Sequence, residues 1–157
     1  MAQPLSLKAR AIALLAQREH SRLELRRKLL RLAHPAIESE EEADLQARVD
    51  RLLDELQAQG YLNESRFVES RIHARAARHG NLRIKMELAQ HGTALSEQQQ
   101  AELDRSELER ARQVWARKFD AVAVNDPKLL AKQMRFLAAR GFSAEVIRRV
   151  VRAELDE

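Results

Sequence analysis

Residues 133–141 read QMRFLAARG and residues 84–92 read IKMELAQHG, so each segment places a leucine four positions before a glycine. A third segment, LRRKLLRLA at 25–33, has a leucine at the same position and ends in alanine instead of glycine. A leucine on the last turn followed by glycine is typical of a helix end, because glycine adopts the left-handed conformation without a steric penalty. The three segments therefore predict one helical unit that is repeated three times.

Apolar spacing and capping signals predict helices through almost the whole chain. Apolar residues recur at i, i+3, i+4 and i+7, and no period-2 run of β-branched residues indicates a strand. Capping boxes begin at Ser21, Ser96 and Ser106, and Asp126 precedes a proline at a helix start. The predicted helices are 5–18, 21–33, 45–59, 63–79, 81–91, 95–104, 106–121, 127–140 and 143–155. The fold class is all-α.

Grouping these nine helices in threes predicts three domains. The domains are a first repeat at 1–60, a second at 61–105 and a third at 106–157. The interval between the first two repeats is the longer one, and an acidic loop insertion at 34–44 accounts for the extra length. The stretch QGYLNESRF at 59–67 joins the first repeat to the second, with Gly60 ending one helix and Asn63 capping the next.

The sequence contains none of the usual signatures of an active site. With no cysteine there is no disulfide, zinc–thiolate site or cysteine nucleophile. The five histidines form no i, i+4 pair, and no glycine-rich phosphate loop is present. We expect no catalytic residue, no metal and no cofactor, and hence a protein that is not an enzyme. The N-terminus has no signal-peptide layout and no apolar run is long enough to span a bilayer, so we expect a soluble intracellular protein.

Basic side chains form rows behind the apolar faces. Arg71, Arg75 and Arg78 stand at i, i+4 and i+7, and the span 70–85 contains no acidic residue. Like charges stacked on one helix face repel, so a row that stays unpaired suits a polyanionic or acidic partner. The alternative is a solvated face whose acidic partners are distant in the sequence. The complete set of candidate binding residues is Arg71, Arg75, Arg78, Arg83 and Lys85 in the second repeat, Arg27, Lys28 and Arg31 in the first, and Lys128, Lys132, Arg135, Arg148, Arg149 and Arg152 in the third.

Two aromatic residues need separate interpretations. Trp115 is in register with the apolar face of its helix, so it is expected in the core. Phe67 lies close to the Arg71 row, where it either fills the junction between the first two repeats or contacts a partner. The junction is the favoured interpretation.

Four motifs resemble those of the RecX regulatory proteins of bacteria. They are HSRLELRRKL (20–29), QGYLNESRFVESRI (59–72), RIKMELAQHG (83–92) and RFLAARGFS (135–143), in the order of that family and over nearly the whole chain. The resemblance implies tandem three-helix repeats in an elongated, curved rod. It also implies a cytoplasmic, non-enzymatic modulator that binds RecA–single-stranded DNA filaments. Such a modulator restrains ATP hydrolysis and strand exchange, and so acts on DNA repair and the SOS response.

Different classes of function remain open at this point. The first is an inhibitor of the RecA recombinase that works as a monomer, with single-stranded DNA as a further partner. The second is a helical repeat that binds nucleic acid directly, without RecA. A phosphate-dominated binder loses affinity steeply with salt, by a log–log slope of about −0.7 per contact on single strands, so salt dependence distinguishes these two. A third, weaker class is a scaffold for another acidic protein.

Overall fold

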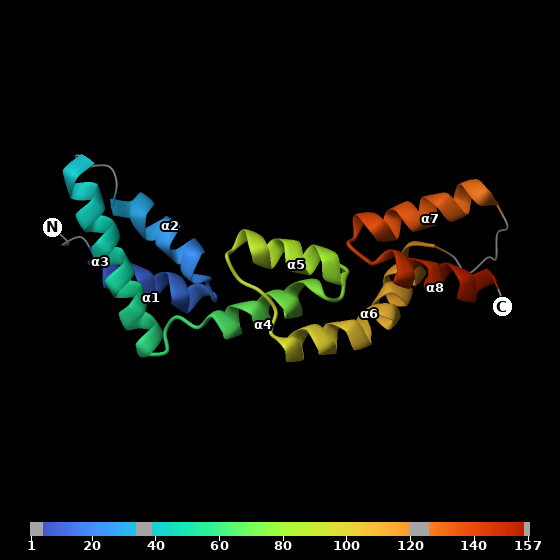
Figure 1. Ribbon diagram of the computed structural model, residues 1–157, viewed down its shortest axis with the longest axis horizontal. Helices are drawn as coiled ribbons and strands as arrows, with labels where there is room; N and C mark the ends of the chain where they lie inside the picture. Colours follow the sequence, from blue (N-terminus) through green and yellow to red (C-terminus); the bar gives the residue numbers. More distant parts are fainter. Residues whose placement is uncertain (1–4, 34–38, 120–125, 156–157) are drawn as a thin grey trace. The chain divides into compact units, whose positions relative to one another are not determined.

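The computed structural model describes residues 5–33, 39–119 and 126–155. Within these ranges the chain forms eight α-helices and no strand (Figure 1). The helices are α1 (Leu7–Gln17), α2 (Arg22–Ala33), α3 (Ser39–Ala58), α4 (Glu64–Arg75), α5 (Asn81–Gln90), α6 (Glu97–Lys118), α7 (Pro127–Ala139) and α8 (Ala144–Leu155). The predicted all-α class is confirmed.

Several predicted helix starts are confirmed by their hydrogen bonds. The Ser96 hydroxyl accepts from the Gln99 backbone N–H at 3.1 Å, and the Gln99 side chain accepts from the Ser96 N–H at 3.0 Å. This completes a capping box at the start of α6. At the start of α7, Asp126 accepts from the Lys128 N–H, and at the start of α4, Asn63 accepts from the Arg66 N–H. Each bond satisfies a backbone donor that the helix itself leaves unpaired.

The predicted boundary between helices 95–104 and 106–121 is wrong, because α6 is continuous through both. Ser106 lies inside this helix and does not cap one. Its hydroxyl donates to the Leu103 carbonyl at 3.2 Å and accepts from Arg110 Nε at 2.9 Å. A serine side chain in a helix can bond backward to the preceding turn in this way, so the sequence of a capping box does not by itself start a helix.

The acidic loop insertion predicted for 34–44 is also wrong in its second half. Helix α3 begins at Ser39, so residues 39–44 are helical, while residues 34–38 lie outside the described residues. The physical reason is composition: glutamate and alanine favour helices, and acidic side chains in the first turn interact favourably with the helix dipole. The extra length assigned to a loop insertion in the predicted first repeat therefore goes partly into a longer helix.

The helices divide into two compact units. Unit 1 comprises Met1–Ser70 with His91–Thr93, and unit 2 comprises Arg71–Gln90 with Ala94–Glu157. The boundary falls inside α4, so this division follows packing and not the order of the helices. The division into three repeats stays a prediction.

The core of unit 1 is formed by α1, α2, α3 and the turn that follows them. Its fully buried apolar side chains are Ala11, Leu25, Leu29, Leu45, Val49, Leu53, Leu56 and Leu62. Gly60 has the predicted left-handed conformation, with φ 83°, and the Tyr61 and Leu62 N–H groups return to the Leu56 carbonyl. Phe67 is fully buried, with its ring 5.3 Å from that of His91. Phe67 is therefore a packing residue, as favoured by its sequence position.

The core of unit 2 is formed by α6, α7 and α8. Its buried apolar side chains are Ala111, Val114, Trp115, Leu137, Phe142, Ile147, Val150 and Val151. The prediction that Trp115 lies in the core is confirmed, since it is 5% exposed. Its indole N–H donates to the buried Gln133 side chain at 3.2 Å, which satisfies the polar end of the ring.

The guanidinium of Arg110 on α6 holds the end of α4 and the start of α5. It donates to the Ala76 carbonyl at 3.0 Å, the His79 carbonyl at 2.9 Å and the Leu103 carbonyl at 3.2 Å, and also to the Asn81 side chain. Helix α4 ends at Arg75 and not at the predicted residue 79, because the following carbonyls bond to Arg110 and not to another helical turn.

Gly80 brings two turns of unit 2 into backbone contact. Its N–H donates to the Arg140 carbonyl at 2.8 Å, and the Leu82 N–H donates to the Gly141 carbonyl at 3.0 Å. A Cβ at Gly80 would lie 2.4 Å from the carbonyl carbon and oxygen of Gly141. The turn after α4 and the turn after α7 therefore meet through main-chain atoms, which only glycine permits at this distance.

We predict that Gly80→Ala lowers the free energy of unfolding by about 2–3 kcal/mol, because the added methyl group meets backbone that cannot move aside. Gly60→Ala is the matched control. No atom lies within 4 Å of a Cβ at Gly60, so only the left-handed backbone is penalised, by about 1 kcal/mol. Urea unfolding followed by circular dichroism measures both, and equal losses would contradict the backbone contact.

Candidate functional site

The basic rows predicted in the third repeat are exposed. Helix α7 carries Lys128, Lys132 and Arg135, and all three side chains are exposed. The same holds for the row on α8, which is Arg148, Arg149 and Arg152. Within the described part of the chain these six side chains form no ion pair. The two rows are therefore available to an acidic or polyanionic partner.

The row predicted in the first repeat is only partly available. Arg27 and Arg31 are exposed, but Lys28 is half-buried, with Nζ 3.0 Å from His20 Nε2 and 3.7 Å from Glu24 Oε1. A lysine ammonium only donates, so His20 accepts at Nε2 and donates from Nδ1 to the Arg18 carbonyl at 2.9 Å. His20 is buried, which lowers its pKa and keeps the imidazole neutral. Lys28 thus serves the packing of unit 1.

The row Arg71–Arg75–Arg78 does not stay unpaired. Glu87 on α5 accepts from Arg75 Nε at 3.0 Å and lies 3.4 Å from Arg71. The alternative of an acidic partner outside the span is confirmed for these two arginines. Arg78 lies on the turn after α4, so it leaves the helical row. Sequence reasoning missed Glu87 because it stands just beyond the acid-free span.

The residues downstream of that row are exposed as well. Arg83 and Lys85 both lie on α5 with exposed side chains. Arg83 also donates to the Ala139 carbonyl at 3.2 Å, a contact within unit 2. His79 precedes this helix, and its pKa is lowered by burial and by the charges of Arg83 and Arg140. The imidazole is therefore neutral at pH 7 and adds no positive charge to this surface.

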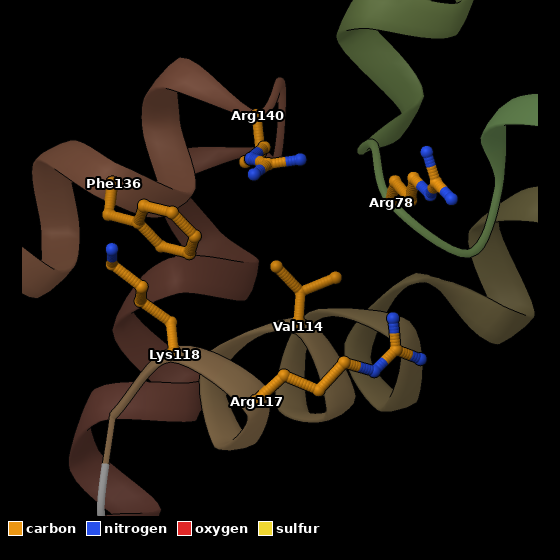
Figure 2. Close-up of a pocket in the computed structure, with 6 residues that line it drawn as sticks. All are labelled: Arg78, Val114, Arg117, Lys118, Phe136 and Arg140. Atoms are coloured by element: carbon orange, nitrogen blue, oxygen red, sulfur yellow. The ribbon is translucent and has the colours of Figure 1, made fainter.

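Four cations surround a hollow of about 370 Å³ in unit 2, here called the basic pocket. It is lined by Arg78, Val114, Arg117, Lys118, Phe136 and Arg140. Figure 2 shows these side chains arranged around a common space, with Arg78 on the turn after α4, three residues on α6, and Phe136 and Arg140 on or just after α7.

Phe136 organises one side of the basic pocket. The Arg140 guanidinium lies 5.3 Å and the Lys118 ammonium 5.8 Å from the centroid of its ring. Phe119 meets the same ring edge-on at 5.4 Å. Sequence reasoning missed Arg117, Lys118 and Arg140 as candidates. Arg140 could have been found from the sequence, because Lys132, Phe136 and Arg140 are spaced four residues apart and extend the α7 row to the end of the helix.

The described residues contain no group of three or more histidine, aspartate or glutamate side chains that could hold a metal ion. Among the helices in those ranges, none has the length and apolar character required to cross a membrane.

Comparison with known proteins decides the family. A model of the third three-helix domain of RecX matches residues 105–151. The chain is 45% identical over 151 residues to the regulatory protein RecX of Ralstonia nicotianae, covering 95% of this chain and 88% of that one. It is 48% identical over 158 residues to the regulatory protein RecX of Herbaspirillum seropedicae, covering 98% and 95%. The chain belongs to the RecX family of regulatory proteins.

The RecX fold is supported independently by a solved structure. The crystal structure of RecX from Lactobacillus salivarius superposes with a TM-score of 0.69 and covers 96% of this chain and 94% of that one, at 18% identity. The resemblance to RecX proteins that the four sequence motifs indicated is confirmed. The RecX relatives are matched along most of their own lengths, so the similarity extends well beyond the region of one repeat.

We predict that Glu87→Gln lowers the free energy of unfolding by about 0.5–1 kcal/mol, because Arg71 and Arg75 lose their shared carboxylate. Glu69→Gln on α4 is the matched control, since Glu69 is exposed and forms no interaction with the described residues. Urea unfolding followed by Trp115 fluorescence reports on this unit. The difference between the variants should narrow in high salt, which screens ion pairs. Indistinguishable variants at low salt would contradict the role of Glu87.

A second prediction concerns pH. Burial acts to raise the pKa of Glu24, but the hydrogen bond and charge of Arg18, the charge that His20 carries once it is protonated in acid, and the charge of Lys28 outweigh it and lower the pKa from 4.5 to about 2. A carboxyl with a lowered pKa contributes stability that is complete above its unfolded-state pKa and is lost as the pH falls through its folded-state pKa. The stability advantage of the native protein over Glu24→Gln should therefore shrink as the pH falls from about 5 to about 2.

Denaturant unfolding at a series of pH values measures this advantage. Glu69→Gln again serves as the control, because Glu69 is exposed and forms no interaction with the described residues. A stability difference for Glu24→Gln that does not change with pH would contradict the Arg18–Glu24 interaction.

Proposed function

We propose that this chain binds RecA and RecA–single-stranded DNA filaments. By binding them it inhibits recombinase, strand-exchange and ATPase activity, and so modulates DNA repair and the SOS response. The observation that carries the proposal is the similarity to regulatory proteins named RecX over 95% or more of the chain. The resemblance of its motifs to that family implies RecA as the partner.

The proposed inhibition needs no covalent chemistry. Several helices present exposed cations on the side opposite their apolar contacts, and an acidic partner can meet them at several points. Each exposed ion pair contributes only about 0–1 kcal/mol, so binding depends on many such contacts acting together. A ligand that bridges several points of a filament restrains its extension, and this accounts for slower ATP hydrolysis without an active site. We infer a non-enzymatic regulator that acts as a cytoplasmic monomer without a cofactor.

The exposed members of the predicted rows are the preferred contact residues. On α7 and α8 they are Lys128, Lys132, Arg135, Arg148, Arg149 and Arg152. Arg27, Arg31, Arg78, Arg83 and Lys85 are exposed as well. Arg71, Arg75 and Lys28 have partners within the chain, so they contribute to binding only after exchanging those partners.

Direct binding of nucleic acid without RecA is the second candidate function, and the basic pocket is the observation that favours it. The two functions differ in their response to salt and to RecA. A direct binder holds naked single strands with a steep salt dependence. A filament regulator instead changes the activity of RecA at concentrations where naked DNA is not bound.

The ATPase activity of RecA on single-stranded DNA, titrated with this protein, tests the proposal. We predict inhibition that increases with concentration, together with co-sedimentation of the protein with filaments. Absence of both inhibition and co-sedimentation would refute it.

Charge reversal locates the surface in the same assay. Lys128→Glu with Lys132→Glu should raise the concentration needed for half-inhibition about tenfold or more, because exposed cations become repulsive to an acidic surface. The control, Arg48→Glu with Arg51→Glu on α3, changes the net charge equally at exposed positions outside the rows. Circular dichroism verifies that both remain folded. An equal effect of the two pairs would reject the α7 row.

A further inference from the structure

The positive charges of the basic pocket in unit 2 are not balanced by acidic side chains among the described residues that line it. Arg78, Arg117 and Lys118 are exposed and Arg140 is half-buried, and none of the described residues that line the hollow is acidic. Among the residues that the structure describes, none of the four cations forms an ion pair. A hollow lined by charges of one sign concentrates the electrostatic potential and attracts counter-ions.

Two of the three guanidinium groups of the pocket, those of Arg117 and Arg140, are held in place by contacts that leave their charge uncompensated. Arg117 donates to the Ala77 carbonyl at 3.3 Å, and Arg140 lies over the Phe136 ring. Neither contact neutralises a positive charge. Arginine donors that are fixed before a ligand arrives lose less conformational entropy on binding, and their planar fork matches the oxygens of a phosphate.

The size and lining of the hollow suit a nucleotide unit better than a bare carboxylate. Its volume of about 370 Å³ falls within the roughly 300–1,000 Å³ that ligand pockets occupy. Val114 and Phe136 supply an apolar floor beside the cations. The combination of a basic groove with an aromatic or guanidinium surface is how proteins hold single strands without reading their sequence.

The α7 row extends the pocket in one direction. Lys128, Lys132, Phe136 and Arg140 recur every four residues, so each lies about one helical turn from the next. Lys128 and Lys132 are exposed, and they continue the charge of the pocket along the helix. Two exposed cations one turn apart beside the pocket suit a polymer that carries one phosphate in each unit, and this favours a nucleic-acid strand over an acidic protein segment.

We propose that the basic pocket binds the phosphate backbone of single-stranded nucleic acid, with the α7 row contacting the adjoining phosphates. This inference rests on the proposed function in one respect, namely that the bound strand is the single-stranded DNA of the RecA filament. The contact itself can be tested on naked DNA.

The test measures fluorescence anisotropy of a labelled oligothymidylate over a series of KCl concentrations. Arg78→Gln with Lys118→Gln removes two pocket charges whose side chains form no hydrogen bond with the described residues. We expect affinity at low salt to fall about tenfold and the log–log salt slope to become less negative by about 1.4, at about 0.7 per phosphate contact.

The matched control is Arg48→Gln with Arg51→Gln, which lowers the net charge by the same amount at exposed positions on α3. Its affinity should fall less than about threefold, with an unchanged salt slope. Equal losses in the two variants would overturn the proposal, because they would reflect net charge alone. Absence of salt-dependent binding by the native protein would overturn it too.

The RecA ATPase assay separates this inference from the proposed function. A pocket variant that keeps its oligothymidylate affinity but loses inhibition of RecA would overturn the inference, since the pocket would then contact an acidic protein surface. A pocket variant with weakened oligothymidylate binding supports the inference, even if the native protein leaves RecA activity unchanged and the proposed filament function fails.

Discussion

The hydrogen bonds of the Arg110 guanidinium are the interaction on which unit 2 depends. They satisfy carbonyls in the turn after α4 and within α6, and they bind Asn81 at the start of α5. Burial lowers the pKa of Arg110, and Glu107 offsets only part of that effect. A half-buried charge without a close carboxylate is tolerated because nearly every donor has an acceptor. The turn held in this way carries Arg78 to the basic pocket and Gly80 to its contact with Gly141.

The basic side chains of the chain have two distinct roles. Arg71 and Arg75 share Glu87, and Lys28 bonds with His20, so these cations stabilise the fold. The rows on α7 and α8 and the pocket residues have no such carboxylate among the described residues, and their mutual repulsion is a small cost to stability. The net charge of the chain does not distinguish the cations that are paired within the fold from those that are not. A partner with repeated negative charges would relieve this repulsion. The same charges that slightly lower the stability of the free protein would therefore favour binding of such a partner.

Local features of the fold were predictable from the sequence, and long-range features were not. Helix periodicity, the Ser96 capping box and the left-handed Gly60 depend on neighbouring residues, so the sequence displays them directly. The helix start predicted at Ser106 was wrong, because the Ser106 hydroxyl donates to the carbonyl of Leu103 in the preceding turn of α6. Glu87 approaches Arg71 and Arg75 only after α4 and α5 fold together, and the same holds for the side chains of the basic pocket. The need for glycine at position 80 could not be predicted, because it comes from the close approach of the Gly141 backbone and not from the dihedral angles of Gly80 itself.

The contact between Gly80 and Gly141 has a consequence for how this surface can diverge. Arg78 and Arg140 stand within two residues of the paired glycines, so main-chain hydrogen bonds fix the separation of their Cα atoms. Apolar residues in the core can be exchanged for others of similar volume without altering that separation. Substitutions in the core therefore leave the spacing of these two charged residues unchanged. Related proteins can differ in their core residues while they keep the same geometry at the ligand-binding surface.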